Sequence, residues 1–292
     1  MIMNKYLQSY RGLISLLLLL SLVFSGCANL KSIRAFSEIS SEATTYTTFA
    51  DDYIKTVERQ KRYQDASQHS KLDEIIKKRE AQQPALLATH KEVSDYISAL
   101  GELASDEIIS YDKSLDEMSK KMETIKDKDG NQVFEKGQID AFGALSKLLA
   151  KAATDAYRQN KLKEIIESSN KDFQIIIAIL KKYIEIGYIE SLKNERGAVE
   201  KYYNTIIMTA KTNPPQDAAI ELVMDKFIER KDAIDTKKKA AESYLKILNK
   251  IGEGHQLLYD KRNEISSEQL LSTIKGYGKD ISNLYKSMKE LK

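Results

Sequence analysis

Three histidines, one cysteine and many carboxylates are the side chains that could carry chemistry in this chain. The histidines are His69, His90 and His255, and none lies in a Glu-x-x-His, His-x-x-x-His or His-Glu-x-x-His pattern. Those spacings place zinc or di-iron ligands on one helix face. The sequence also lacks Gly-x-Ser-x-Gly and Gly-x-x-x-x-Gly-Lys, which mark a nucleophile elbow and a phosphate-binding loop. We therefore predict no catalytic residue, no metal site and no cofactor.

One acidic stretch, Asp127-Lys128-Asp129-Gly130-Asn131, has the composition of a calcium loop. An EF-hand loop places glycine sixth and glutamate twelfth from its first aspartate. Counted from Asp127, Gly130 is fourth and Gln138 is twelfth, so the spacing does not match. Asp-Gly is a common turn dipeptide, and the stretch predicts an ordinary turn.

The only cysteine, Cys27, follows an apolar segment close to the N-terminus. Residues 1–11 contain Lys5 and Arg11 and no acidic residue, and the next apolar run, Leu13 to Phe24, is 12 residues long. A signal-peptide core has roughly 7–15 apolar residues, whereas a helix needs ~20 to span the bilayer. The run ends in Phe24-Ser25-Gly26-Cys27, an apolar residue followed by two small residues and the cysteine.

This tetrapeptide resembles the lipobox of bacterial lipoproteins, although Phe24 stands where leucine is usual. The resemblance implies that residues 1–26 are a signal peptide cleaved between Gly26 and Cys27, and that the Cys27 thiol is linked to diacylglycerol. Two or three acyl chains, palmitate among them, would anchor the protein stably, because each buried methylene contributes about 0.8 kcal/mol. The alternatives are an uncleaved membrane anchor or an ordinary signal peptide with a chance cysteine.

The residue after Cys27 is Ala28 rather than aspartate. In enteric-type bacteria an aspartate at this position retains a lipoprotein in the inner membrane, so the resemblance implies sorting to the outer membrane. We therefore expect a lipid-anchored protein of the bacterial cell envelope. It would face the periplasm from the outer membrane if the organism has one.

The rest of the chain has the composition of a helical protein. Removing residues 1–26 leaves 266 of the 292 residues, enough for one large domain or two small ones. Because Lys5 and Arg11 lie in the leader, 44 cationic and 43 acidic residues remain, a balance that gives no attraction to nucleic acid. The low number of breakers, 12 glycines and 3 prolines, favours long helices.

Apolar residues at spacings of three and four predict an all-α, elongated up-and-down bundle of six to eight helices, with long central helices. Residues 27–35 are the expected lipidated N-terminus and short tether. Residues 36–292 are the expected bundle domain, with a candidate sub-boundary near 213–215 at Asn213-Pro214-Pro215. The predicted helices span about residues 36–79 (one helix, or two divided at the polar stretch 63–70), 85–104, 106–125, 136–168, 170–210 and 217–251.

Helix boundaries follow from caps and breakers. Pro84 is expected to begin a new helix, and Gly252-Glu253-Gly254 is expected to end one. The last helix opens near residues 265–268 with Ser266 as its predicted cap. Gly276 and Gly278 lie inside that helix, where they allow either close packing or a kink.

The most apolar part of the mature chain begins at Phe173 and runs through residues 175–180. Lys181, Lys182, Glu185 and Glu190 interrupt the stretch that continues to residue 192. Each charge at mid-bilayer costs on the order of 3 kcal/mol, so we interpret this stretch as a buried central helix rather than a membrane-inserted one.

The adjacent residues Tyr202 and Tyr203 suggest a contact surface, because one of the two must point away from the main apolar stripe. Our main hypothesis is a non-enzymatic, lipid-anchored scaffold or adaptor for envelope protein partners. The alternatives are a membrane-active helical protein, pore-forming or membrane-remodelling, and an enzyme with an unrecognised site.

Overall fold

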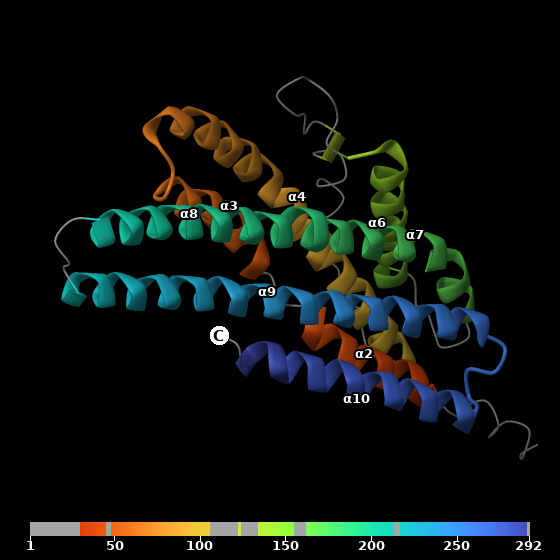
Figure 1. Ribbon diagram of the computed structural model, residues 1–292. Coiled ribbons are helices and arrows are strands. Elements are labelled where there is room, and N and C mark those ends of the chain that lie inside the picture. The colour runs from red at the N-terminus through yellow and green to blue at the C-terminus, as the bar shows by residue number, and fades with distance from the viewer. Residues whose placement is uncertain are drawn as a thin grey trace, which may run out of the picture.

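The computed structural model describes residues 30–44, 48–105, 122–123, 134–154, 162–212 and 217–290. Within these residues the protein is an all-α bundle of seven helices without strands, if one uninterrupted helix with a π-helical segment is counted once. The predicted fold class is therefore confirmed (Figure 1).

Two long antiparallel helices run along the molecule. The first consists of α7 (Leu162–Lys182), the π-helical segment η3 (Tyr183–Ile189) and α8 (Glu190–Thr212). The second is α9 (Asp217–Asp260), whose 44 residues extend about 66 Å at 1.5 Å per residue. Figure 1 shows α8 and α9 reaching together to one end of the molecule.

The other helices pack around this pair. Helices α2 (Lys31–Thr44) and α10 (Glu268–Glu290) pack against each other and against α9. Helix α3 (Thr48–Lys61) packs against α8 and against α4 (Ala66–Ala104). Helix α6 (Lys136–Thr154) packs against α7 and α4. The largest fully buried side chains include Tyr96, Phe142, Phe173, Tyr188 and Tyr244.

The predicted break at Pro84 is wrong, because α4 continues through this residue. An interior proline costs a helix about 3 kcal/mol through its missing N–H and the clash of its ring. The residues on both sides of it offset that cost by packing into the core. Leu72 and Leu86 are buried, and each such side chain contributes ~1.5–3 kcal/mol.

Two more predicted boundaries lie inside helices. The expected boundary at residues 168–170 is internal to α7, because Ser169 and Asn170 are buried and satisfied by hydrogen bonds to other helices. Helix α9 does not end at Gly252 and Gly254 but continues to Asp260. These glycines mark places where neighbouring helices approach α9 closely.

The two ends of the bundle also differ from expectation. Residues 31–35, predicted to belong to the tether, form the first turns of α2, where Ile33 is fully buried. The cap of α10 is Ser267 rather than Ser266, because the Leu270 N–H donates to Ser267 Oγ at 3.2 Å. Cys27, the turn at 127–131 and the sub-boundary at 213–215 lie outside the described residues, as does all of the 106–125 helix except 122–123.

The apolar stretch that begins at Phe173 is buried, as predicted. Phe173, Ile176, Ile177 and Leu180 all lie in the core beneath α4 and α9. In the described part of the chain, none of the helices combines the length and the apolar character required to cross a membrane.

Helix α2 lies close to three helices at three glycines. A Cβ at Gly101 of α4 would overlap Ser37, and one at Gly278 of α10 would overlap Ile39. A Cβ at Gly254 of α9 would lie 2.7 Å from Phe36 Cε2, well inside van der Waals contact. Three different helices thus lack a side chain where α2 packs against them.

Two glycines of α10 should respond oppositely to alanine. Gly278→Ala is expected to destabilise the protein by about 1–3 kcal/mol, because the new methyl group overlaps the Ile39 side chain. Gly276→Ala is the matched control, since nothing lies within 4 Å of its Cβ position. It should stabilise by about 0.5–1 kcal/mol through helix propensity. Urea unfolding followed by circular dichroism measures both changes, and changes of the same sign would contradict this packing.

Candidate functional site

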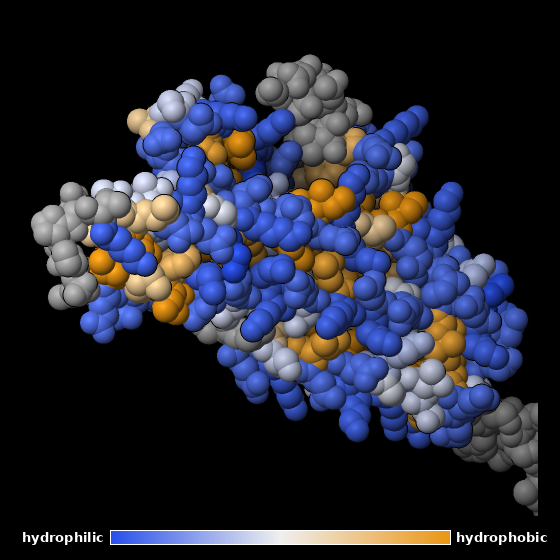
Figure 2. Space-filling view, in the orientation of Figure 1, coloured by the Kyte–Doolittle hydropathy of each residue, from blue (hydrophilic) through white to orange (hydrophobic). Residues whose placement is uncertain are grey.

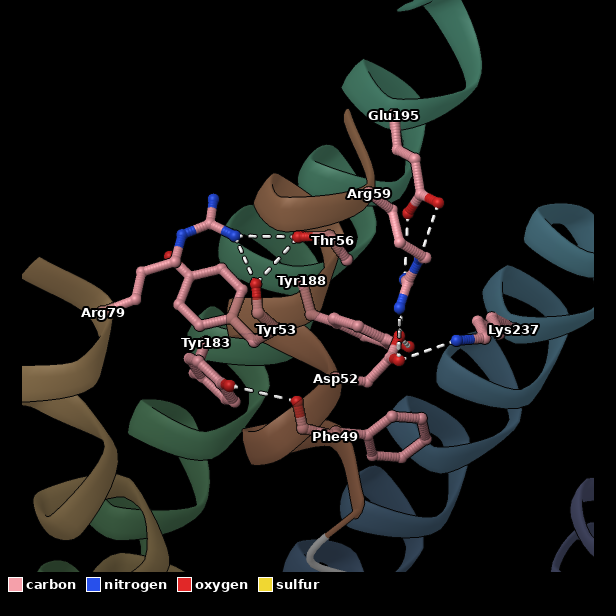
Figure 3. A network of polar contacts seen from close by, with 10 residues as sticks. All are labelled: Phe49, Asp52, Tyr53, Thr56, Arg59, Arg79, Tyr183, Tyr188, Glu195 and Lys237. Atoms are coloured by element: carbon pink, nitrogen blue, oxygen red, sulfur yellow. Dashed lines mark hydrogen bonds and ion pairs between the residues drawn. The ribbon is translucent and has the colours of Figure 1, made fainter. Parts of the chain in front are cut away.

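An ion-pair network joins α3 to α8 through Arg59 (Figure 3). The Arg59 guanidinium donates to both carboxylate oxygens of Glu195 at 2.7 and 2.9 Å. It also donates to both oxygens of Asp52 at 2.8 and 3.0 Å. Asp52 and Arg59 are seven residues apart on α3, which places them on one face two turns apart. The Glu195 side chain is only 3% exposed, so this ion pair is largely removed from water.

Asp52 collects donors from two further elements. Lys237 of α9 donates to its Oδ1 at 2.6 Å, and the Tyr188 hydroxyl of η3 donates to its Oδ2 at 2.7 Å. Tyr183, five residues before Tyr188, donates from its hydroxyl to the Phe49 carbonyl at 3.3 Å. Because hydrogen bonds of a π-helix run between residues five apart, the π-helical segment turns both tyrosines toward α3.

The balance between burial and these donors sets the protonation of the network. Burial alone would raise the pKa of Asp52, but hydrogen bonds from Arg59 and Lys237 outweigh it and lower the pKa to about 2. For Glu195 burial dominates, and its pKa is raised despite the two bonds from Arg59. Burial also raises the pKa of Tyr188, and the neighbouring Asp52 charge raises it further. At neutral pH the Tyr188 hydroxyl therefore stays protonated and donates its hydrogen bond to Asp52.

A second arginine ties α4 to the same region. Arg79 donates to the Tyr53 carbonyl, to Thr56 Oγ1 at 2.9 Å and to Ser191 Oγ at 2.6 Å, and its guanidinium lies 3.7 Å from the centre of the Tyr53 ring. Burial lowers the pKa of Arg79. Four elements, α3, α4, η3–α8 and α9, are thus fixed to one another by polar contacts (Figure 3).

A cavity of about 200 Å³ lies beside this network, between α3, α8 and α9. Its polar lining includes Arg59, Arg62, Arg230, Lys237 and Glu195. Its remaining lining residues are Tyr63, Val199, Ala233 and Ile234. The cavity therefore combines an apolar floor with a predominantly cationic wall, an arrangement that favours a small anionic group.

Aromatic rings continue from this cavity along α8 and α9. The Tyr63 and Tyr202 ring centres are 5.4 Å apart, those of Tyr202 and Tyr203 are also 5.4 Å apart, and Tyr203 stacks on Phe227 at 5.6 Å. Of the predicted contact pair, Tyr202 is exposed and Tyr203 is half-buried. The structure thus brings both tyrosines next to the cationic cavity.

From Tyr202 toward the end of the molecule that α8 and α9 reach together, the two helices expose large apolar side chains, which we call the distal apolar patch. Met208 of α8 is 70% exposed and Leu222 of α9 is 63% exposed. Figure 2 shows apolar surface at the end of the molecule that α8 and α9 form in Figure 1. Exposed apolar surface of this kind is typical of sites that bind other molecules. The members of the patch are Tyr202, Met208, Leu222, Met224 and Ile228.

Two of the three histidines are buried in the core. His255 Nε2 lies 2.6 Å from the Tyr96 hydroxyl, and its Nδ1 lies 2.9 Å from Asn170 Oδ1. His90 Nδ1 lies 3.0 Å from the Tyr244 hydroxyl. Burial lowers the pKa of His90 to about 4 and that of His255 to about 3, so both are neutral at pH 7.

No group of three or more His, Cys, Asp or Glu side chains suited to a metal ion occurs among the residues that the structure describes. The predicted lipidation residue, Cys27, falls outside that part of the chain. Sequence reasoning missed the ion-pair network, although one signal was present. Asp52, Thr56 and Arg59 follow the buried Phe49 at spacings of three, four and three, so polar residues occupy the core-facing positions of α3.

No protein-family model, curated protein sequence or solved structure matches this chain. The geometry of the cavity, the aromatic rings and the distal apolar patch therefore carries the functional argument.

Proposed function

We propose that this protein is a bacterial lipoprotein and acts as a non-enzymatic scaffold. In this proposal Cys27 carries the lipid after cleavage at Gly26, and the outer membrane is the anchoring site in an organism that has one. The bundle binds an envelope protein partner through the distal apolar patch. The exposure of that patch is the observation that supports binding, because five large apolar side chains face solvent on two adjacent helices.

The position of the patch supports a scaffold rather than a loose tether. Helix α2 begins at Lys31, and Ser32 Oγ donates to the Ile265 carbonyl at 3.2 Å, just beyond the Asp260 end of α9. The patch lies near the other end of α9. Ile228 of the patch and Asp260 are 32 positions apart on α9, or about 48 Å. A rigid helix pair would thus hold the contact surface well away from the lipid.

The test places a photo-crosslinking residue at Met208 in living cells, in chains with either the native Cys27 or Cys27→Ser. Palmitate labelling and membrane association are expected to be lost completely in Cys27→Ser, because the thiol is the acceptor of the lipid. A defined crosslinked partner is expected from Met208. None is expected from Asn283, which is an exposed polar position on α10 and serves as the control site.

Two results would contradict the proposal. Palmitate labelling that persists in Cys27→Ser, or an intact leader found by mass spectrometry, would refute the lipoprotein assignment. Equal crosslinking from Met208 and Asn283 would refute the contact surface. Crosslinking of Met208 to lipid alone would instead favour a membrane-active protein.

A further inference from the structure

We infer that the cavity between α3, α8 and α9 binds one carboxylate side chain of the partner, which belongs to an acidic and apolar protein segment lying along α8 and α9. This inference rests on the proposed function and specifies the chemistry of the partner. We call the cavity, with its cationic side chains Arg59, Arg62, Arg230 and Lys237, the carboxylate socket.

The carboxylates of Asp52 and Glu195 pair with only part of the positive charge of the socket. Asp52 and Glu195 neutralise two of the four cationic groups, because Arg59 is shared between both carboxylates and Lys237 pairs with Asp52. Arg62 and Arg230 have exposed side chains, and no carboxylate of the described residues forms an ion pair with either. Arg62 and Arg230 thus line the cavity without an ion-pair partner among the described residues, so both can contact an external anion.

The size of the socket limits the anion. A volume of about 200 Å³ is below the range of roughly 300–1,000 Å³ typical of sites for whole small molecules. One acidic side chain or one phosphate group fits that space. Val199 and Ile234 supply an apolar floor, which suits the methylenes of a glutamate side chain better than a fully hydrated phosphate.

The surroundings favour a protein segment over a lipid headgroup. Tyr63 lines the socket and contacts the ring of Tyr202, which belongs to the distal apolar patch, so the cationic socket adjoins an exposed aromatic ring. A helix with acidic and apolar residues matches both surfaces at once. The start of the described chain lies near the Asp260 end of α9, where Ser32 bonds to Ile265. Ile234 of the socket is 26 residues before Asp260 on the same helix, or about 39 Å away, so the socket is far from that end. Headgroups of the anchoring membrane are therefore distant.

The test uses the full-length chain in phosphatidylcholine nanodiscs and two fluorescein-labelled probes measured by anisotropy. The first probe is a 14-residue amphipathic helix of leucine and glutamate, and the second has glutamine at every glutamate. We expect the glutamate peptide to bind at least tenfold more tightly, with an affinity that falls as salt rises. The double variant Arg62→Gln/Arg230→Gln should remove this preference, because it removes the two unpaired charges.

The matched control is Lys201→Gln/Lys239→Gln, which removes two exposed lysines of α8 and α9 that do not line the socket. It should keep the tenfold preference. An equal affinity for both peptides, or a preference that survives Arg62→Gln/Arg230→Gln, would overturn the carboxylate socket. So would displacement of the peptide by 10 mM inorganic phosphate that sodium chloride of equal ionic strength does not cause, or arginine-dependent binding of phosphatidylglycerol vesicles without peptide binding. Either result would reassign the cavity to a phosphate group.

The two proposals fail separately. If the Met208 crosslink forms in cells but the peptide preference is absent, the scaffold stands and the carboxylate socket is wrong. If the peptide preference is present but no site-specific crosslink forms, the socket stands and the scaffold proposal is wrong. Circular dichroism of Arg62→Gln/Arg230→Gln should match the parent chain, since both side chains are exposed.

Discussion

Arg59→Leu is expected to lower the free energy of unfolding by about 3–5 kcal/mol, the largest loss for any single substitution considered for this protein. The Glu195 side chain is 3% exposed, and the substitution removes both hydrogen bonds that it accepts from the Arg59 guanidinium. Asp52 keeps Lys237 and Tyr188, so Glu195 accounts for most of the loss. Urea unfolding followed by circular dichroism measures the change.

Removing the charges of Arg59, Asp52 and Glu195 together should lower the free energy of unfolding much less than removing the charge of Arg59 alone. The triple variant Arg59→Leu/Asp52→Asn/Glu195→Gln leaves no buried carboxylate in the network, so it should recover most of the stability lost in Arg59→Leu. Arg230→Leu is the matched control, because Arg230 is exposed and lines the same cavity; its effect should stay within about 0.5 kcal/mol. If Arg59→Leu and Arg230→Leu had equal effects, the network would not stabilise the fold.

The fold class could be predicted because few residues in the chain disfavour helices. Where prediction failed, a local signal was overridden by packing that only the tertiary structure supplies. Pro84 begins no new helix because the buried residues around it keep α4 continuous. Gly252 and Gly254 do not end α9, because they are the places where α7 and α2 approach it. A glycine in a helical sequence can therefore mark a close contact between helices as well as the end of a helix.

The site was predictable only in its exposed part. The pair Tyr202-Tyr203 suggested a contact surface because adjacent residues of a helix cannot share one face. The Arg59–Glu195 pair joins residues 136 positions apart, and no local pattern specifies such a partner. The π-helical segment was not predicted from the sequence either. In the structure it directs the hydroxyl groups of Tyr183 and Tyr188 toward α3, where both donate hydrogen bonds.

Lowering the pH from 7 to 4 is expected to destabilise the protein steeply, because His90 and His255 must stay neutral in the folded state. Their pKa values are lowered by burial to about 4 and about 3, whereas an unfolded histidine has a pKa of about 6.5. Between these values the unfolded chain binds protons that the folded chain does not. Stability therefore rises with pH across this window and is lost as the pH falls through it.

Burial favours the neutral form of His255, and its hydrogen bonds indicate which ring nitrogen carries the proton. Asn170 donates from Nδ2 to Gln256 at 2.9 Å, so its Oδ1 faces His255 and accepts the proton on Nδ1. His255 Nε2 then has a free lone pair that accepts from the Tyr96 hydroxyl. Protonation of Nε2 would create a charged imidazolium in a site without solvent, which burial disfavours. Below pH 3.8 Asp52 adds to the loss, because its lowered pKa of about 2 stabilises the fold only while the carboxylate is ionised.

Each buried histidine should contribute a slope of up to about 1.4 kcal/mol per pH unit between pH 6 and pH 4.5. Urea unfolding at pH 7, 6, 5 and 4.5 measures that slope independently of the absolute stability. His90→Phe and His255→Phe should each lower stability at pH 7, since each removes a buried hydrogen bond to Tyr244 or Tyr96, and each should reduce the slope by about half. A slope that remained unchanged in both variants would mean that other groups cause the acid sensitivity, and that these two histidines already carry protons in the folded protein.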